Sequence, residues 1–589
     1  MKRSYGLVFC LFLICKPVGA AEEVTFWLTV LHNDDAESQL IDAGPGLEDF
    51  GGVARFATLA AELKKAAVRP ADDGAKQGVI LLSAGDNIFP GPQLNASLAK
   101  GIPFYETIAM ESIGYDASGL SNHDFDLGPD ILANFIEGFS TLPFLAANLR
   151  FKKEPNLYDL VLAHRLTRTA VLNVGREKVG VIGLTTPRLS VISTPRKVVV
   201  RSDLVKLISA TVERLQQQGV GILILMTHLE SIEEDHELLR NVRAIDIVVS
   251  SGSERSNELQ ANRGDLLVPG DVPFAPYPLF IRDADGKRVP LISTTGQYRY
   301  LGQLRAGFNK HGKLIKIDAE RSHPFRVAGG NHPDAVAPDA KLQRKVVEPV
   351  RSALNALASH VIATTEVNLD GIENHVRTKE TNEGNLVADA FLAEAARLAP
   401  EFGMPAPDLA IANGGAIRND SVIPPGNISE LDTFQILPFP NVVAIVPNIP
   451  ATQLKEILEN AVSQVEILDG RFAQVAGVHF TWDRSGTAQQ LDANGNVVRS
   501  GTRIREIVLN DGTVIVNGGT VVTGARTVTI AITTFLATGG DEYPFRGIHF
   551  ANLGITSQQA LFHYIVNMLD GVISAADYPE NAEGRIVQQ

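Results

Sequence analysis

Short aliphatic runs that end in small or polar residues recur through the first half of the chain. Uninterrupted apolar runs of this length predict strands that are buried on both faces, as in a sheet covered by helices. Between them, Ala54 to about Lys65 has alanines at close-packing spacing and predicts a helix. The pattern predicts a layered α/β fold. The runs are Val24–Leu31, Val79–Leu82, Leu142–Asn148, Lys178–Leu184, Gly221–Thr227 and Ala244–Ser250.

Ligand-type side chains follow several of these predicted strands. Ligands of open α/β sheets bind at the carboxyl edge, where such residues meet. Taken singly, each residue also fits a turn or a helix cap, and for Asp86 in Gly-Asp-Asn that is the commoner role. Together they are what a dinuclear metal site on a layered sheet requires. They are Asp35 with Glu37, Asp86, Asn122, His228 and Glu254.

The segment Ser121-Asn122-His123-Asp124-Phe125-Asp126 is the most specific signal. After a turn of small residues, Asn122 can offer an amide oxygen to a metal and His123 an imidazole to a substrate. Asp126 can hold that imidazole in place. The alternative is a surface-loop histidine that is merely paired with a nearby carboxylate.

Length and charge narrow the possible functions. With 589 residues the chain is too long for one core, so we expect at least two domains. A net charge of −14 argues against a nucleic acid polymer or an anionic membrane as partner. After residue 20 we find no segment that predicts a transmembrane helix.

The N-terminus predicts a cleavable secretory signal. Lys2 and Arg3 precede a short apolar stretch, and Val18-Gly19-Ala20 offers small residues at the cleavage position, so residues 1–20 would be removed. This indicates a periplasmic or secreted protein. Both cysteines, Cys10 and Cys15, lie in the signal, so any metal must be held by oxygen or imidazole nitrogen.

A second domain follows a Gly- and Pro-rich boundary at Val327–Asp339. Ala340–Ala358 predicts a connecting helix that Pro349 can kink. Further on, a short strand at Leu409–Ala412 leads into Asn413-Gly414-Gly415-Ala416-Ile417-Arg418. The glycines let the backbone approach a ligand closely, and the guanidinium of Arg418 can form a bidentate contact with a phosphate or carboxylate. A glycine turn with a surface arginine is an equal alternative.

These motifs resemble the secreted 5′-nucleotidase / UDP-sugar hydrolase family, whose first domain is a calcineurin-like metallophosphoesterase. The matching segments are LHNDDAE, GGVAR, GDNIFPG, SNHDFD, THL and SGSE, then RTKETNEGNL, NGGAIR, LPFPN and FLATGGDEYP. The resemblance implies an αββα metallophosphoesterase sandwich followed by a smaller α/β substrate-specificity domain. The implied division is signal 1–20, catalytic domain 24–330, linker and connecting helix 331–359, and substrate-binding domain 360–589.

The resemblance also implies roles for individual residues. Asp86 would bridge two divalent metals, Asp35 would join it on the first, and Asn122 and His228 would hold the second. His123 would act on the scissile phosphate or leaving oxygen, with Asp126 orienting it. Phe439 and Phe535 would sandwich a nucleobase and Asp541 would bind the ribose. Arg377, Asn413 and Arg418 belong to the matching substrate motifs, and the two arginines would help to hold the polar part of the ligand.

Three family histidines are replaced here. They fall on Glu37, Gly252 and Glu254, so the first metal would be held by Asp35, Glu37, Asp86 and Glu254, all oxygen ligands. Such a set favours Mn²⁺, Mg²⁺ or Ca²⁺ over Zn²⁺. We expect metal-dependent hydrolysis of extracytoplasmic nucleotides. Alternatives are a 2′,3′-cyclic nucleotide phosphodiesterase, a UDP-sugar hydrolase, a broad phosphatase, or a catalytically silent nucleotide-binding protein.

Overall fold

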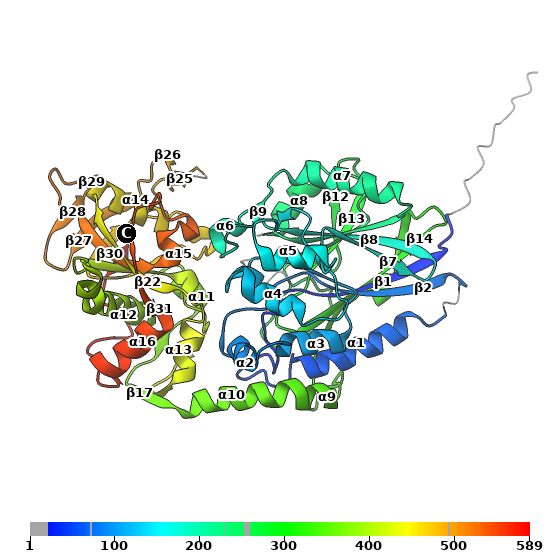
Figure 1. Cartoon of the computed structure of the whole chain (residues 1–589), viewed down its shortest axis with the longest axis horizontal. Coiled ribbons are helices and arrows are strands. Elements are labelled where there is room, and N and C mark those ends of the chain that lie inside the picture. Colours follow the sequence, from blue (N-terminus) through cyan, green and yellow to red (C-terminus); the bar gives the residue numbers. More distant parts are fainter. Residues whose placement is uncertain (1–21, 71–72, 230, 253–258, 493–494) are drawn as a thin grey trace, which may run out of the picture.

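The computed structural model describes residues 22–70, 73–229, 231–252, 259–492 and 495–589. Two bodies lie side by side, joined along one edge by a long helix (Figure 1). The predicted signal at 1–20 and the predicted ligand Glu254 fall outside the described residues. None of the helices in the described ranges is long and apolar enough to cross a bilayer.

Two stacked sheets form the centre of the first body. The first runs β15-β14-β1-β2-β3-β4-β6, with β16 paired to β14, and the second runs β12-β13-β11-β10-β8-β7. The strands of the first are β1 (Phe26–Asn33), β2 (Lys76–Ser83), β3 (Ala117–Gly119), β4 (Phe144–Leu145), β6 (Leu166–Thr167), β14 (Tyr300–Phe308), β15 (Leu314–Ile317) and β16 (His323–Arg326). Those of the second are β7 (Thr169–Val174), β8 (Glu177–Thr185), β10 (Ile222–His228), β11 (Ile247–Ser251), β12 (Leu279–Arg282) and β13 (Arg288–Ile292).

Side chains alternate between the two faces of each sheet. In the parallel pair β1 and β2, Val30 lies opposite Ile80, and both point into the apolar layer between the sheets. Leu31 and Leu81 point the other way, toward α1 (Val53–Ala67). Every residue of β1 is buried because both faces are covered.

Helices cover the outer faces of both sheets. On the second sheet, Leu207 and Ile208 of α7 (Leu204–Gln217) pack with Ile182 and Leu225 of the strands. The order helix, sheet, sheet, helix confirms the predicted layered sandwich, with α7 at one side and α1 and α3 (Tyr105–Ile113) at the other in Figure 1. The other helices of this body are α2 (Pro92–Lys100), α4 (Pro129–Glu137), α5 (Pro155–Leu162), α6 (Leu189–Ile192) and α8 (Ile232–Leu239), and β5 (Leu149–Arg150) pairs with β9 (Val199–Val200).

The second body is built on a five-stranded sheet in the order β23-β19-β30-β22-β31. Helix α12 (Asn382–Leu398) packs on one face and α14 (Ala451–Ala461) on the other. The strands are β19 (Leu409–Asn413), β22 (Val442–Ile449), β23 (Ala473–Ala476), β30 (Val528–Thr533) and β31 (Ala551–Thr556). Other elements of this body include α11 (Glu373–Val376), α13 (Glu430–Ile436), α15 (Thr534–Ala537) and α16 (Ser557–His563). A further five-stranded sheet runs in the order β29 (Thr520–Val521), β28 (Val514–Asn517), β27 (Ile504–Leu509), β24 (Val478–Trp482) and β33 (Ile586–Gln588).

The connecting helix has three parts. A short α9 (Ala340–Leu342) passes through a π-helical turn, Gln343–Val347, into α10 (Glu348–Ser359). Pro349 lies in the first turn of α10, where its missing N–H removes one backbone hydrogen bond from the turn before it. The irregularity therefore lies just before Pro349, and α10 runs on between the two bodies (Figure 1).

Candidate metal and substrate site

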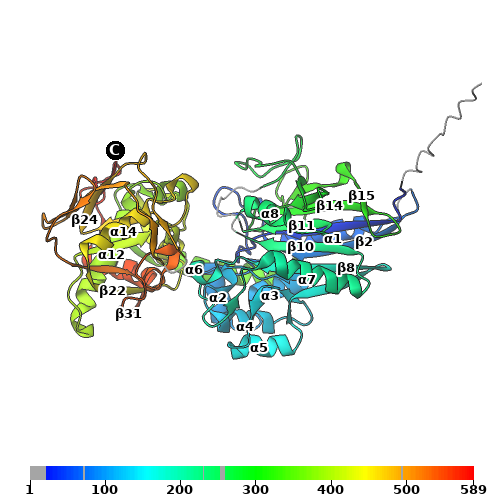
Figure 2. The ribbon, with the colours of Figure 1, turned by 90° about the horizontal axis from the view of Figure 1, so that it is seen from above.

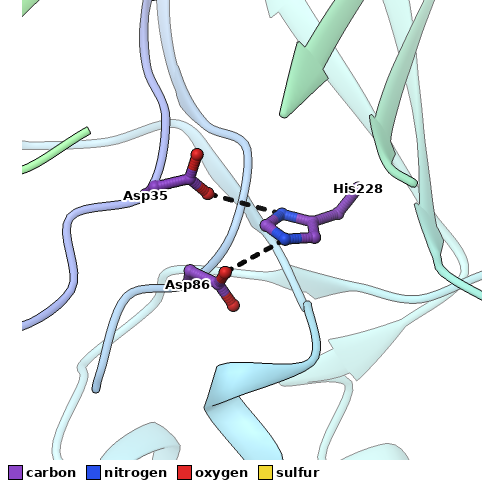
Figure 3. Close-up of side chains that lie close together, drawn as sticks. All are labelled: Asp35, Asp86 and His228. Carbon is purple, nitrogen blue, oxygen red and sulfur yellow. Dashed lines mark ion pairs between the residues drawn. The ribbon is translucent and has the colours of Figure 1, made fainter. Parts of the chain in front are cut away.

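Three of the predicted ligands meet at the carboxyl ends of the strands. Asp35 follows β1, Asp86 follows β2 and His228 ends β10, and their ligand atoms all lie within 4.8 Å of one another (Figure 3). Asp35 and Asp86 both have φ of 45°, in the left-handed region that ordinary residues seldom adopt. Backbone held in this way is frequent where side chains are aimed at a functional point.

The contacts of His228 suit a metal ligand. Its Nδ1 lies 3.3 Å from the carbonyl oxygen of Ala84, to which it can donate. Its Nε2 lies 3.0 Å from Asp86 Oδ2. That Nε2 is buried, and its contact with Asp86 is an ion pair without good hydrogen-bond geometry. The carboxylate of Asp35 lies 3.7 Å from Nδ1, so each ring nitrogen faces one acidic residue of the cluster (Figure 3). A histidine that donates to a backbone carbonyl through one nitrogen and presents the other to a carboxylate has the usual arrangement around a bound metal.

The charges at this point are unbalanced. Burial raises the pKa of Asp35, and the neighbouring carboxylates of Asp86 and Glu37 add to this, although His228 opposes it. Burial alone would lower the pKa of His228, but Asp86 and Asp35 raise it to about 10. Positive charge on the ring would therefore balance the crowded carboxylates. A divalent cation would fill the same role, so the donor set fits one.

Beside this cluster, His123 is held by Asp126. Its Nδ1 lies 2.6 Å from Asp126 Oδ2, and Ser193 Oγ donates to the other oxygen of Asp126 at 2.8 Å. The backbone N–H of His123 donates to Asp86 Oδ1 at 2.9 Å. Burial would lower the pKa of His123, but Asp126 and Asp86 outweigh it and raise the pKa to about 9. Asn122, half-buried, directly precedes the histidine, and its carbonyl oxygen lies 2.7 Å from Ser193 Oγ and competes with Asp126 for the one hydroxyl hydrogen.

Glu37 lies near the cluster but is turned toward different neighbours. Its N–H donates to the carbonyl of Asp86 at 2.7 Å, while its carboxylate accepts from Gln297 Nε2 at 3.1 Å. Burial raises its pKa, and the positive groups of His123 and Arg418 oppose this. Among the described residues, Glu37 is not in the close group of Asp35, Asp86 and His228. Its role as a metal ligand stays a prediction.

Gly252 is the position at which the sequence resemblance predicts a lost histidine, and the backbone leaves no room for a side chain. Its φ is +97°, and a Cβ built there would lie 2.2 Å from the carbonyl oxygen of Leu229 and 2.8 Å from His228 Nε2. The loop therefore passes so close to His228 that glycine is required.

Two predicted substrate residues reach from the second body to His123. The Phe439 ring is stacked at 6.3 Å and 21° from the His123 ring. The guanidinium of Arg418 lies over the rings of both Phe89 and Phe439, at 5.2 and 5.5 Å. Phe89 itself contacts the edge of His123 at 4.7 Å. The structure thus brings the two bodies together at the candidate catalytic histidine.

The other predicted substrate residues lie within the second body. Asn413 Nδ2 donates to Asp541 Oδ2 at 2.7 Å. The Phe535 ring lies so close to Gly540 that a Cβ there would be 2.5 Å from it. Arg377 pairs with Glu373 at 2.8 Å and donates to the carbonyl of Leu468 at 3.0 Å. Among the described aromatic residues, no direct ring contact joins Phe439 to Phe535, and the predicted sandwich of a base between them stays a prediction.

Some contacts could not be foreseen from motifs. Ser193 and Gln297 belong to distant loops, and only the folded chain brings them to Asp126 and Glu37. Ser121 donates its hydroxyl hydrogen to Asp86 Oδ1. Phe89 did carry a signal in the sequence, because it is an aromatic residue in the loop three positions after Asp86.

Comparison with known proteins agrees with this architecture. Residues 361–546 match the family described as 5′-nucleotidase, C-terminal domain. The chain is 28% identical to the snake venom 5′-nucleotidase of Crotalus adamanteus over 537 residues, which are 88% of this chain and 82% of that protein. It is 27% identical to the 5′-nucleotidase of Homo sapiens over 489 residues, covering 81% of this chain and 79% of that one.

A solved structure also matches along nearly the whole chain. The crystal structure of the 5′-nucleotidase precursor from Thermus thermophilus superposes with a TM-score of 0.75 at 26% identity, covering 96% of this chain and 99% of that one. The sandwich, the second domain and the sequence similarity across both agree. The chain is therefore similar to two-domain 5′-nucleotidases along most of its length, and residues 361–546 match the C-terminal domain of that family.

Proposed function

We propose that this protein is a metal-dependent phosphoester hydrolase that releases phosphate from nucleotides outside the cytoplasm. The observation that carries the proposal is the cluster of Asp35, Asp86 and His228 with the His123–Asp126 pair beside it. Relatives named 5′-nucleotidase along most of the chain support the substrate class. Residues 24–330 would carry the chemistry and residues 360–589 the substrate specificity.

Two divalent ions would be held at the carboxyl ends of the strands. Asp35, Glu37, Asp86 and Glu254 would hold the first, and Asp86, Asn122 and His228 the second. The oxygen-rich first set favours Mn²⁺, Mg²⁺ or Ca²⁺ over Zn²⁺. Bound there, the ions would supply Lewis acidity and an activated water for in-line attack on phosphorus.

The chain's own residues orient and neutralise the substrate. His123, held by Asp126 at 2.6 Å, would donate from Nε2 to a phosphate or leaving oxygen. Arg418, already within 5.5 Å of the Phe89 and Phe439 rings, would pair with the phosphate. The Asn413–Asp541 pair would bind the ribose, Arg377 would help to hold the polar part of the ligand, and Phe439 with Phe535 would sandwich the base.

The direct test is release of phosphate from AMP with Mn²⁺, Mg²⁺, Ca²⁺ or Zn²⁺, together with elemental analysis. We expect bound metal, and turnover that is abolished in Asp86→Ala and strongly reduced in His123→Ala. Cyclic nucleotides and UDP-sugars in the same assay would show whether the preferred substrate is another phosphoester. Absence of turnover on all of them under every metal would refute the hydrolase.

One observation favours a second candidate. Gly252 leaves one ligand position of the family without a side chain, and the backbone there cannot accept one. A protein with a reduced metal shell would still bind nucleotides through its second domain. Calorimetry with AMP separates the two: tight binding without metal content or turnover would identify a nucleotide-binding protein.

A further inference from the structure

A basic cavity lies on the outer face of the first domain. Its volume is about 330 Å³, and it is formed by α7 and the segments that follow β6 and β9. Helix α7 covers the outer face of the second sheet (Figures 1 and 2). None of the residues of the candidate metal and substrate site contributes to the lining. The lining residues are Arg168, Arg201, Lys206, Leu207, Ala210, Thr211 and Arg214.

The spacing of the residues on α7 explains the shape of the cavity. Lys206, Ala210 and Arg214 are four apart, so they lie on one stripe of the helix. The small side chain of Ala210 leaves a hollow between the two long cations. Arg168 and Arg201 approach from the neighbouring segments. The result is a concave site with an apolar floor and a rim of cations.

This concentration of positive charge is unusual for the chain. The protein carries a net charge of −14, yet no acidic side chain lines the cavity. Asp203, just outside it, forms a two-pronged ion pair with Arg201. Arg214 donates to Thr169 Oγ1 at 3.2 Å. Arg168 and Lys206 make no ion pair or hydrogen bond with any residue in the described ranges, and both are exposed.

A fifth cation adds to the repulsion. Arg150 lies in β5, the strand paired with β9, next to the segment that carries Arg201. Burial lowers the pKa of Arg150, and the charges of Arg168 and Arg201 lower it further, while the charge of Asp203 opposes them. Like charges gathered in this way oppose the folded state, and an anion of high charge density would relieve the repulsion. Guanidinium groups are well matched to the oxygens of phosphate or sulfate.

We propose that this cavity is a second anion site, separate from the catalytic centre, that binds a compact oxyanion through Arg168, Arg201, Lys206 and Arg214. The ligand class is a phosphate or sulfate group, free or carried by a small molecule or lipid headgroup. The concave shape and its limited volume favour a compact group over an extended polymer.

The test is titration calorimetry of the full-length protein with orthophosphate and with pyrophosphate. It is carried out in an Asp86→Ala background, so that binding is read apart from turnover. The test variant is Arg168→Gln with Lys206→Gln, because both side chains are exposed and without described partners. The control is Lys65→Gln with Lys310→Gln, which makes the same change of charge at exposed positions outside the cavity. Vesicles of phosphatidylglycerol form a further arm.

We expect saturable binding that weakens with added salt. It should become about tenfold weaker or more in the test variant, as loss of charge-assisted contacts implies, and stay unchanged in the control. Binding of orthophosphate or pyrophosphate would identify a free anion, and vesicle binding alone would identify a headgroup. Equal binding by the test and control variants, or no saturable binding of any of these ligands, would overturn the proposal. Neither result bears on hydrolysis, which is measured with the unaltered Asp86.

Discussion

Glu383 offers a sharp test of the electrostatics inside the second domain. It lies in the first turn of α12, fully buried, and its Oε2 accepts from Asn419 Nδ2 at 3.1 Å. Its Oε1 and Asn419 Oδ1 are both buried without a described hydrogen-bond partner. Burial raises the pKa of Glu383 to about 8, helped by the charges of Asp370 and Asp432 and opposed by Asn419.

The sign of the pH effect follows from this shift. The ordinary pKa of the side chain is 4.5, so between that value and about 8 the folded state keeps a proton that the unfolded state has lost. Stability contributed by Glu383 is therefore present at pH 5 and falls as the pH rises toward 8. For one proton, the free energy of unfolding falls by about 1.4 kcal/mol per pH unit. Over the three units from pH 5 to pH 8, and with allowance for partial ionisation of folded Glu383 near pH 8, the loss of stability is about 3 kcal/mol.

The substitution Glu383→Gln removes this dependence and gives Asn419 Oδ1 a donor. The quantity to compare is the free energy of unfolding of E383Q minus that of the unaltered protein. We expect this difference to be about 3 kcal/mol larger at pH 8 than at pH 5. Guanidinium unfolding at both pH values, followed by circular dichroism, measures the difference. The contributions of the other titrating groups to the pH dependence are the same in E383Q and in the unaltered protein, so they cancel in the difference.

Glu380→Gln is the matched contrast. Glu380 accepts from Asn385 Nδ2 at 2.8 Å and from the backbone N–H groups of Glu583 and Ile586 at 2.9 and 3.0 Å. The side-chain amide of a glutamine would point its NH₂ group at one of these N–H donors, where an acceptor is needed. The free energy of unfolding of E380Q should therefore be lower than that of the unaltered protein. If E383Q kept the full pH dependence of the unaltered protein, or lost stability at pH 8, the reasoning about buried Glu383 would be refuted.

Four further outcomes follow from the site. In steady-state kinetics on AMP, the kcat of His123→Ala should be about 10²–10⁴-fold lower than that of the unaltered protein, the range for loss of a proton donor. A reduction of less than tenfold would show that His123 takes no part in the chemistry. Asp126→Asn should lower kcat by about 10–100-fold, because it loses only the group that holds the ring, and circular dichroism should show an unchanged fold. A loss of kcat equal to that of His123→Ala would contradict a positioning role. Phe439→Ala should raise the KM for AMP by about 5–150-fold, and leave that for a phosphoester without a base unchanged, if Phe439 stacks on the nucleobase. Gly252→Ala should lower the free energy of unfolding by about 2 kcal/mol or more because of its φ of +97° and the clash with Leu229, and a variant of equal stability would show that the loop can move.

Sequence reasoning predicted the parts of the fold that repeat a strong pattern. The buried strands carrying Asp86 and His228 were foreseen because long apolar runs have few alternatives in a covered sheet. Asp35 and Asp86 then meet because the parallel strands β1 and β2 lie in register, and the stacking of the second sheet brings His228, at the end of β10, to the same edge. The run at Leu142–Asn148 gave only the two-residue strand Phe144–Leu145, since its pairing depends on neighbours and not on its own composition.

The orientation of individual side chains could not be predicted in this way. Glu37 is two residues from Asp35, yet the left-handed backbone at both positions turns its carboxylate to Gln297, which is 260 residues away in the chain. The stacking of Phe439 on His123 depends equally on how the two domains meet. Such contacts come from tertiary structure, which no local motif contains.

The path of the chain at Gly252 also limits how the metal shell could be changed by mutation. Replacement of Gly252 by histidine would not restore the family's ligand, because the first carbon of any side chain would collide with the carbonyl of Leu229. A protein engineer who wished to recover that imidazole would have to rebuild the loop first and add the ligand second. The two changes are therefore epistatic: either alone is expected to be neutral or harmful, and only the pair offers a route to the other coordination chemistry.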